Sequence, residues 1–174
     1  MQLFFRPTEN KYEGEGILPH GTFNNTNEWN PLIKYLEKGA LEFPDKTMFK
    51  MGDGNGKIIE QFTYKETNQK SNQIANYLIE NCSINSEDKI GIFMLNSSEF
   101  VFSILATHKT GAIQVPVNKD EKGERLLYVI NYSEMKVLII DKSAIDLIKP
   151  IADKFENLTK IFISGGEGDI PSNL

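Results

Sequence analysis

Apolar residues recur at helical spacing near the start of the chain. Asn30 and Pro31 offer a helix start, because asparagine can cap a first turn and proline at the first helical position gives up no hydrogen bond. An apolar stripe follows before Phe43 and Pro44 interrupt it, and its members are Leu32, Ile33, Leu36, Ala40 and Leu41. This pattern predicts a helix between Pro31 and Phe43.

Two runs rich in strand-forming residues, 47–51 and 57–62, flank the glycine-rich segment Gly52–Gly56. The glycines and an Asn-Gly pair can adopt the positive φ angles that a tight reversal needs, so the pattern predicts a β-hairpin near residues 47–62. A phosphate cradle is the alternative for these glycines. No helix follows them to supply free N–H groups and a dipole, which favours the hairpin.

A capping-box pattern at Thr63 and Glu66 predicts the start of a second helix, which reaches about Asn81. One face of this helix is made of small or apolar residues, namely Thr67, Ser71, Ile74, Ala75 and Leu78. Small polar members on an inward face indicate close packing against another element.

From residue 89 the pattern alternates between short apolar runs and helical stripes. The apolar runs at 90–95, 112–115, 137–140 and 161–163 predict four strands, and nearly unbroken apolar strands are typical of a parallel sheet covered on both faces. Three helical segments separate them. The first carries Phe100, Val101, Ile104, Leu105 and His108, the second Leu126, Leu127 and Ile130, and the third is interrupted at Pro150. The predicted fold is α/β, a mostly parallel sheet with helices on both faces.

Ligands of such sheets bind outside the carboxyl ends of the strands, so the loops there carry the candidate chemistry. The glycine-rich loop Gly165–Gly168 resembles a phosphate loop, but no helix pattern follows, and a connector is favoured over an anion site. Asp120 and Asp141 follow two strands and invite comparison with phosphoacceptor domains. Those domains need an acidic cluster after the first strand, where Leu95 and Asn96 stand instead. Helix caps and solvated turns are therefore the favoured roles of both aspartates.

Other reactive side chains are few. His108 falls on the predicted inward face of its helix, which favours packing over general-base catalysis, and His20 stands beside Gly21 in the N-terminal segment. No histidine pair or carboxylate cluster has metal-ligand spacing. Cys82 is the single cysteine, which excludes an internal disulfide and fits a buried thiol in a reducing compartment. The sequence thus offers no catalytic, cofactor-binding or metal-binding residue.

Composition narrows the class of protein. A chain of 174 residues with 40% hydrophobic and 25% charged residues is typical of one globular domain. Basic residues are scattered and the net charge is −5, so we expect no nucleic-acid partner. No apolar run approaches the length of a membrane span or a signal peptide, and we expect a cytoplasmic protein. The sequons at Asn24 and Asn96 are then turns and caps rather than glycosylation sites.

Seven segments, in order, resemble the N-terminal region of the adenylate-forming family, which includes AMP-forming acyl-CoA synthetases, luciferases and peptide-synthetase adenylation domains. They are Phe43–Lys46, Thr63–Glu66, the helix positions Asn72, Ala75 and Leu78, Asp88–Ile92, Leu95–Phe100, Lys109–Ala112 with Pro116 and Asn118, and Lys136–Asp141. Leu95 stands where the family usually has proline. Lys122 and Gly123 replace the family's Thr-Pro helix start, which predicts a frayed beginning of the helix that follows.

The resemblance implies an enzyme that joins a carboxylic acid to AMP with release of pyrophosphate and then passes the acyl group to CoA. ATP, Mg²⁺ and CoA are implied for the full-length parent, and none of them for this chain. In the family the phosphate loop, the ribose-binding acid and the catalytic lysine lie beyond the position of Gly165. The resemblance therefore implies that this chain is a non-catalytic scaffold. A free-standing binding or regulatory module that pairs with another chain is the alternative.

The predicted organisation has three parts: an arm over residues 1–29, an α/β subdomain over 30–164, and a connector to a missing region over 165–174. The partners implied are the remainder of the enzyme and, for the parent, a carboxylic acid whose identity the sequence does not specify. Helices and strand edges that an intact enzyme would cover are exposed in such a fragment, so we expect self-association.

Overall fold

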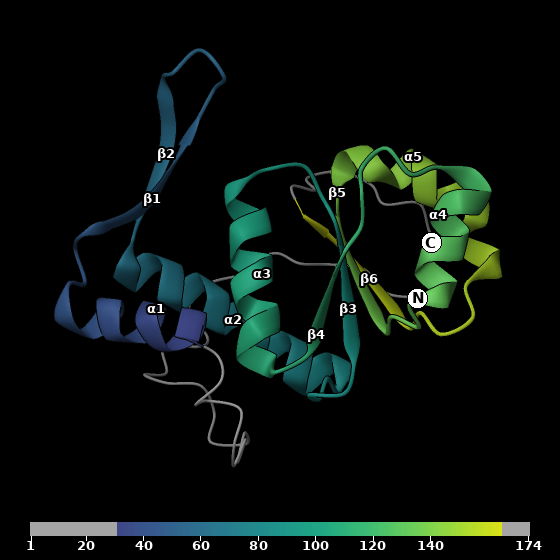
Figure 1. The fold of residues 1–174 in the computed structure, drawn as a ribbon, viewed down its shortest axis with the longest axis horizontal. Helices are drawn as coiled ribbons and strands as arrows, with labels where there is room; N and C mark the ends of the chain where they lie inside the picture. Colours follow the sequence, from purple (N-terminus) through teal and green to yellow (C-terminus); the bar gives the residue numbers. More distant parts are fainter. Residues whose placement is uncertain (1–30, 165–174) are drawn as a thin grey trace.

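The structure is a computed structural model that describes residues 31–164 (Figure 1). The predicted arm over 1–29 and connector over 165–174 lie outside the described residues, as do His20 and the glycines of Gly165–Gly168. The described chain forms a two-stranded hairpin and a four-stranded sheet with helices around them.

The helix α1 (Pro31–Glu42) has the extent that its apolar stripe predicts. The hairpin strands β1 (Thr47–Gly52) and β2 (Ile58–Thr63) follow it, pair antiparallel, and project away from the rest of the molecule in Figure 1. Gly54 and Gly56 turn the chain with φ angles of 75° and 88°, which confirms the hairpin reading of the glycine run.

The helix α2 (Tyr64–Cys82) begins with the predicted capping box, in which Thr63 and Glu66 exchange hydrogen bonds. Thr67, Ser71 and Ala75 are fully buried, and α2 packs closely along α3 (Ser98–Thr110). The Ser71 hydroxyl donates to the carbonyl of Thr67 within its own helix, so it needs no partner from outside. The small inward face of α2 thus allows the close approach that its sequence indicates.

The parallel sheet has the strand order β4-β3-β5-β6. Its strands are β3 (Lys89–Phe93), β4 (Ile113–Pro116), β5 (Val137–Asp141) and β6 (Lys160–Ser164). Each lies within two residues of a predicted apolar run. Pro116 ends β4, which is an edge strand, where a missing N–H disturbs no second neighbour.

Alternate residues of the central strands divide the core between the two faces of the sheet. Val137 and Ile139 of β5 point to the side of α2 and α3, whereas Leu138 and Ile140 point to the opposite side. That side is covered by α4 (Gly123–Tyr132), α5 (Ile145–Ile148) and the flanking 3-10 turns η1 (Lys142–Ala144) and η2 (Lys149–Lys154). Helices therefore cover both faces, as predicted (Figure 1). Pro150 lies where α5 gives way to η2.

The predicted inward face of α3 is only partly right. Phe100, Val101, Ile104 and His108 are half-buried, whereas the fully buried members include Phe102, Ala106 and Lys109. The reason is that α3 packs against the sheet, against α2 and against α1, so more than one stripe is covered. A periodicity argument assumes one inward face and misses the others.

The start of α4 departs from the family pattern as the sequence indicates. Lys122 occupies the cap position without a side-chain hydrogen bond, and Gly123 adopts a φ angle of 53°. Proline cannot adopt that angle, so the family's Thr-Pro start would not fit the backbone that Gly123 has here. The fraying of this helix start stays a prediction.

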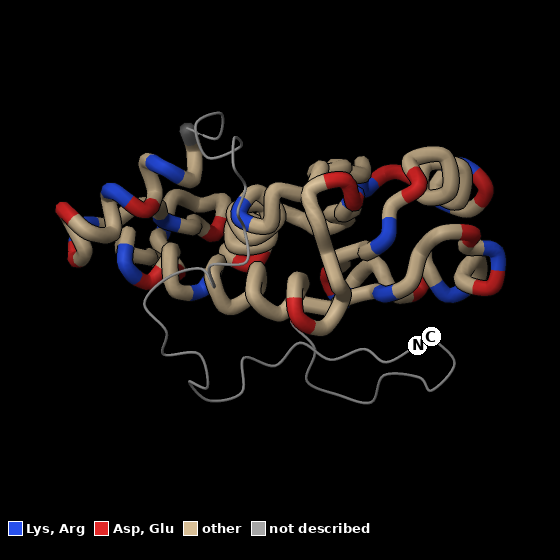
Figure 2. Tube along the Cα trace, turned by 90° about the horizontal axis from the view of Figure 1, so that it is seen from below, with Lys and Arg blue, Asp and Glu red and all other residues tan. Residues whose placement is uncertain are grey.

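Charged residues of both signs are interspersed along the described trace (Figure 2). Within residues 31–164, no helix is both long enough and apolar enough to cross a membrane.

Candidate functional site

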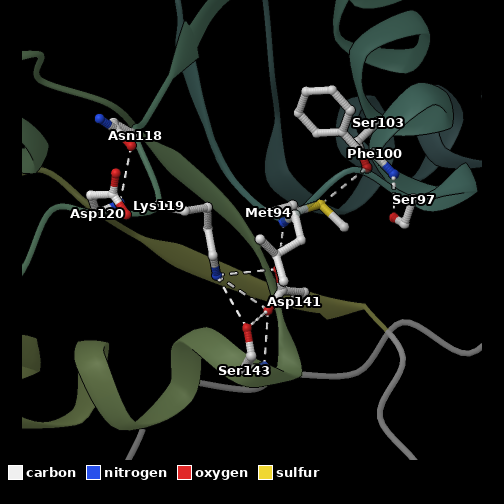
Figure 3. Close-up of polar contacts among 10 residues, drawn as sticks. Met94, Ser97, Phe100, Ser103, Asn118, Lys119, Asp120, Asp141 and Ser143 are labelled. Carbon is white, nitrogen blue, oxygen red and sulfur yellow. Dashed lines mark hydrogen bonds and ion pairs between the residues drawn. The ribbon is translucent and has the colours of Figure 1, made fainter. Parts of the chain in front are cut away.

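The carboxyl ends of β3, β4 and β5 form the edge where a sheet of this kind places its ligands. The chain passes from β3 outward to β4 and then returns across β3 to β5, so the strand order reverses between β3 and β5. Loops that leave adjacent strands in opposite directions open a crevice at such a point. Figure 3 shows the side chains that gather there.

Asp141, the last residue of β5, is the centre of this cluster (Figure 3). Its carboxylate accepts a hydrogen bond from the backbone N–H of Leu95 at 2.7 Å and from that of Ser143 at 2.9 Å. It also accepts from the Ser143 hydroxyl. Asp141 therefore ties the end of β3 to the start of η1, where it is the cap residue that its sequence position predicts.

Lys119 reaches the same carboxylate from the loop after β4. Its ammonium lies 3.2 Å from Asp141 Oδ2 and 3.3 Å from Ser143 Oγ. It also lies 4.5 Å from the ring centre of Phe93, a cation–π contact with the last residue of β3. The ion pair thus spans the crevice between the strands. The sequence did not predict Lys119 as a partner of Asp141.

Burial by itself raises the pKa of Asp141, but hydrogen bonds and a nearby positive charge together lower it by more. Hydrogen bonds from Ser143, the Leu95 N–H and Lys119, together with the charge of Lys119, hold the pKa of Asp141 below its ordinary value. Asp141 is therefore ionised at neutral pH and accepts only. A carboxylate so fully occupied is unsuited to take a proton from a substrate.

The loop after β3 serves mainly to start α3. Ser97 caps this helix by accepting from the N–H of Phe100 at 3.1 Å, as the sequence predicts for Asn96–Ser98. The next residue, Ser98, donates to Glu60 of the hairpin at 2.8 Å. This contact fastens β2 to the beginning of α3.

Asp120, the second aspartate that the sequence singles out, lies in a turn. Its N–H donates to the side chain of Asn118 at 3.0 Å. Asp120 and Asp141 both occur near the edge, but the structure forms the ion pair with Asp141 and Lys119. The prediction that both aspartates lie in caps or turns is confirmed. That prediction did not include the ion pair between Asp141 and Lys119.

The described residues do not fit the metal or phosphates that the family resemblance implies. Among residues 31–164, no three histidine, cysteine or acidic side chains gather as metal ligands. At the cluster, the Lys119 ammonium is committed to Asp141 and Ser143, so it does not face outward as a phosphate ligand. No step through Mg²⁺, ATP or CoA follows from these side chains.

The side chain of Lys109 is fully buried, although its place in the last turn of α3 predicts an exposed dipole partner. Its ammonium donates to Asn68 of α2 at 2.8 Å and to Glu37 of α1 at 3.3 Å. Burial lowers the pKa of Lys109, and Glu37 partly offsets that effect. Lys109 thus joins three helices. The one feature of the sequence that pointed to this lysine is its place in the Lys109–Ala112 segment, which resembles the family.

Cys82 is buried, as predicted, and burial raises the pKa of its thiol. A thiol with a raised pKa holds little thiolate and is a poor nucleophile. Cys82 therefore has the packing role that the sequence indicates.

A model of the family described as AMP-binding enzyme matches residues 36–169. The chain belongs to the AMP-binding enzyme family. The resemblance drawn from the ordered segments is thereby confirmed, and the carboxyl edge described above belongs to the N-terminal region of an adenylate-forming enzyme.

Relatives in the family include synthetases and CoA ligases. The chain is 31% identical over 150 residues to gramicidin S synthase 1 of Brevibacillus brevis. The aligned region covers 80% of this chain and 13% of that protein. It is 28% identical over 136 residues to crotonobetaine/carnitine–CoA ligase of Proteus mirabilis (strain HI4320), covering 78% of this chain and 24% of the ligase. The chain thus spans about a quarter or less of these relatives.

Among solved structures, the anthranilate CoA ligase AuaEII in complex with anthranoyl-AMP aligns with a TM-score of 0.69 and 25% identity. The alignment covers 77% of this chain and 25% of that ligase. Its α/β fold agrees with the parallel sheet and flanking helices described here.

Proposed function

We propose that this chain is the N-terminal part of an ATP-dependent, AMP-forming acid–CoA ligase, and that by itself it is a non-catalytic scaffold. The parent reaction joins a carboxylate to AMP with release of pyrophosphate and then transfers the acyl group to CoA. The partners are the remainder of the enzyme and a carboxylic acid. A cytoplasmic location belongs to the same proposal and is supported by the lone buried cysteine.

One observation carries this proposal: the family match runs over residues 36–169, yet the edge that faces ligands in such folds is internally satisfied. Asp141 accepts from three residues, and Lys119 is paired with it. Transfer of AMP from ATP to a carboxylate, with pyrophosphate as the leaving group, needs oriented donors and a cation directed at the phosphates. These groups must then come from outside the described residues.

Activity assays of this chain test the proposal. We expect no acid-dependent release of pyrophosphate from ATP and no ATP-binding isotherm of about micromolar affinity. A full-length CoA ligase assayed in parallel shows that the reagents are competent. Pyrophosphate release that depends on an added carboxylic acid, and is absent without this chain, would refute the scaffold proposal.

A peptide-synthetase adenylation domain is the second candidate, because gramicidin S synthase 1 is 31% identical to this chain. The full-length relatives behind the two candidates differ in length, since the aligned region covers 24% of the CoA ligase and 13% of the synthase. Sequencing the coding region beyond the codon for Leu174 separates them. A reading frame of ligase length supports the first candidate, and a much longer frame supports the second.

A further inference from the structure

One carboxylate receives hydrogen bonds from residues that follow three different strands. Leu95 follows β3, Lys119 follows β4, and Ser143 follows β5. The side chains of Asp141 and Lys119 are 20% and 19% exposed, so water competes weakly for these contacts. Such charge-assisted bonds are shorter and stronger than neutral ones.

The path of Lys119 shows that this arrangement spans the strand between the two partners. β4 and β5 lie on opposite sides of β3. Lys119 reaches Asp141 (Figure 3), and its ammonium lies over the ring of Phe93 of β3. The ammonium therefore rests between an aromatic face and a carboxylate. Movement of any one of the three loops would break a contact to Asp141.

We propose that Asp141 is a positioning residue that sets the loops after β3, β4 and β5 relative to one another and holds Lys119 inward over Phe93. This role concerns the geometry of the edge and stands whether or not the proposed ligase reaction is correct. It assigns no contact with substrate to Asp141. It does predict that three loops respond together to the charge of one side chain.

Among the described residues, one charged side chain bonds to Asp141, and this makes the titration of its carboxylate easier to assign. Lys119 is the charged side chain that bonds to it, whereas Ser143 and the Leu95 backbone are neutral. Lys142 is next in the chain and exposed. A titration seen at the Leu95 N–H can therefore be attributed to the carboxylate that it contacts.

The experiment is an amide NMR titration of the whole chain, labelled with ¹⁵N, toward acid pH. We expect the amide signals of Leu95 and Ser143 to shift with one common midpoint, below the ordinary pKa of aspartate. In Asp141→Asn both shifts should disappear. Hydrogen exchange at the Leu95 amide should then rise by about tenfold or more, because its charged acceptor is lost.

Asp120→Asn is the matched control, since it removes the same charge from the neighbouring loop. We expect it to leave the Leu95 and Ser143 titrations unchanged. In Lys119→Met the common midpoint should move upward, because the cation that stabilises the ionised carboxylate is gone. The wild-type titration and this variant decide the question even where Asp141→Asn does not fold.

Two results would overturn the proposal. Separate midpoints for Leu95 and Ser143, or no titration at either, would show that no shared carboxylate sets the loops. Faster exchange throughout the sheet in a folded Asp141→Asn, equal to that at Leu95, would show a general loss of stability instead of a positioning role.

Discussion

At the scale of single residues, Lys109 departs most from what local sequence indicates. A lysine near the carboxyl end of a helix ordinarily extends into water and interacts with the helix dipole. Here the side chain is wholly buried between α1, α2 and α3, with Asn68 and Glu37 as partners. Burying a charge is costly even where a partner is present, and the lowered pKa of Lys109 reflects that cost.

The pH dependence of stability should reveal this cost. Because the pKa of Lys109 is lower in the folded than in the unfolded chain, the folded state binds this proton less tightly. The contribution of Lys109 to the free energy of unfolding should therefore increase as pH rises from its folded-state pKa toward the ordinary value of 10.5. Urea unfolding between about pH 8 and about pH 10 measures it.

The variant Lys109→Met should lack this increase, whereas the control Lys38→Met should keep it. Lys38 is the suitable control because its side chain is 63% exposed and pairs with Glu42 on the surface of α1. An identical pH profile for wild type and Lys109→Met would contradict the assignment.

At the scale of elements, the helix starts of α2 and α4 form a contrast. Thr63 and Glu66 satisfy each other's backbone donors at the start of α2. Lys122 has the extended backbone of a cap residue, with φ −146° and ψ 157°, but offers no side-chain acceptor. One helix is thus capped by its own sequence, and the other depends on packing through Leu126 and Ile130.

A cap can therefore be added to α4. Lys122→Ser should stabilise the chain by about 0.5–1 kcal/mol, because its hydroxyl can accept from a free N–H of the first turn. Lys122→Ala is the control, since it also removes lysine but supplies no acceptor. Urea unfolding at neutral pH compares the two variants, and equal stabilities would contradict the prediction.

At the scale of the whole molecule, apolar side chains remain exposed on several elements. Ile113 on β4 is 49% exposed and Leu41 on α1 is 85% exposed. Within the described residues, β4 pairs with β3 alone and forms one edge of the sheet. An edge that carries an exposed isoleucine can pair with another chain.

We propose that the chain self-associates through this edge, and light scattering over a range of concentrations tests it. Ile113→Lys should lower the apparent mass, because a charge on an edge strand opposes pairing. Leu41→Lys removes a more exposed apolar side chain from a helix and should have little effect. A wild-type chain that stays monomeric at high concentration would refute the proposal.

Local patterns in the chain were enough to predict most of the fold. The capping box at Thr63, the glycine turn between β1 and β2, and the apolar runs of the four strands each depend on neighbours within a few residues. Backbone propensity and side-chain period act over that same range, so the elements could be read in order. The same reading indicated the family that the match over residues 36–169 confirmed.

The packed fold alone decided which charged groups meet. Lys119 and Asp141 are 22 residues apart, Leu95 and Asp141 are 46 apart, and Lys109 and Glu37 are 72 apart. No periodicity links such positions, because their distance depends on the strand order and on how α1, α2 and α3 stack. The burial of Lys109 and the contacts of Asp141 with three loops are therefore products of tertiary packing. Packing sets the local dielectric and the partners, and these determine the pKa of each group.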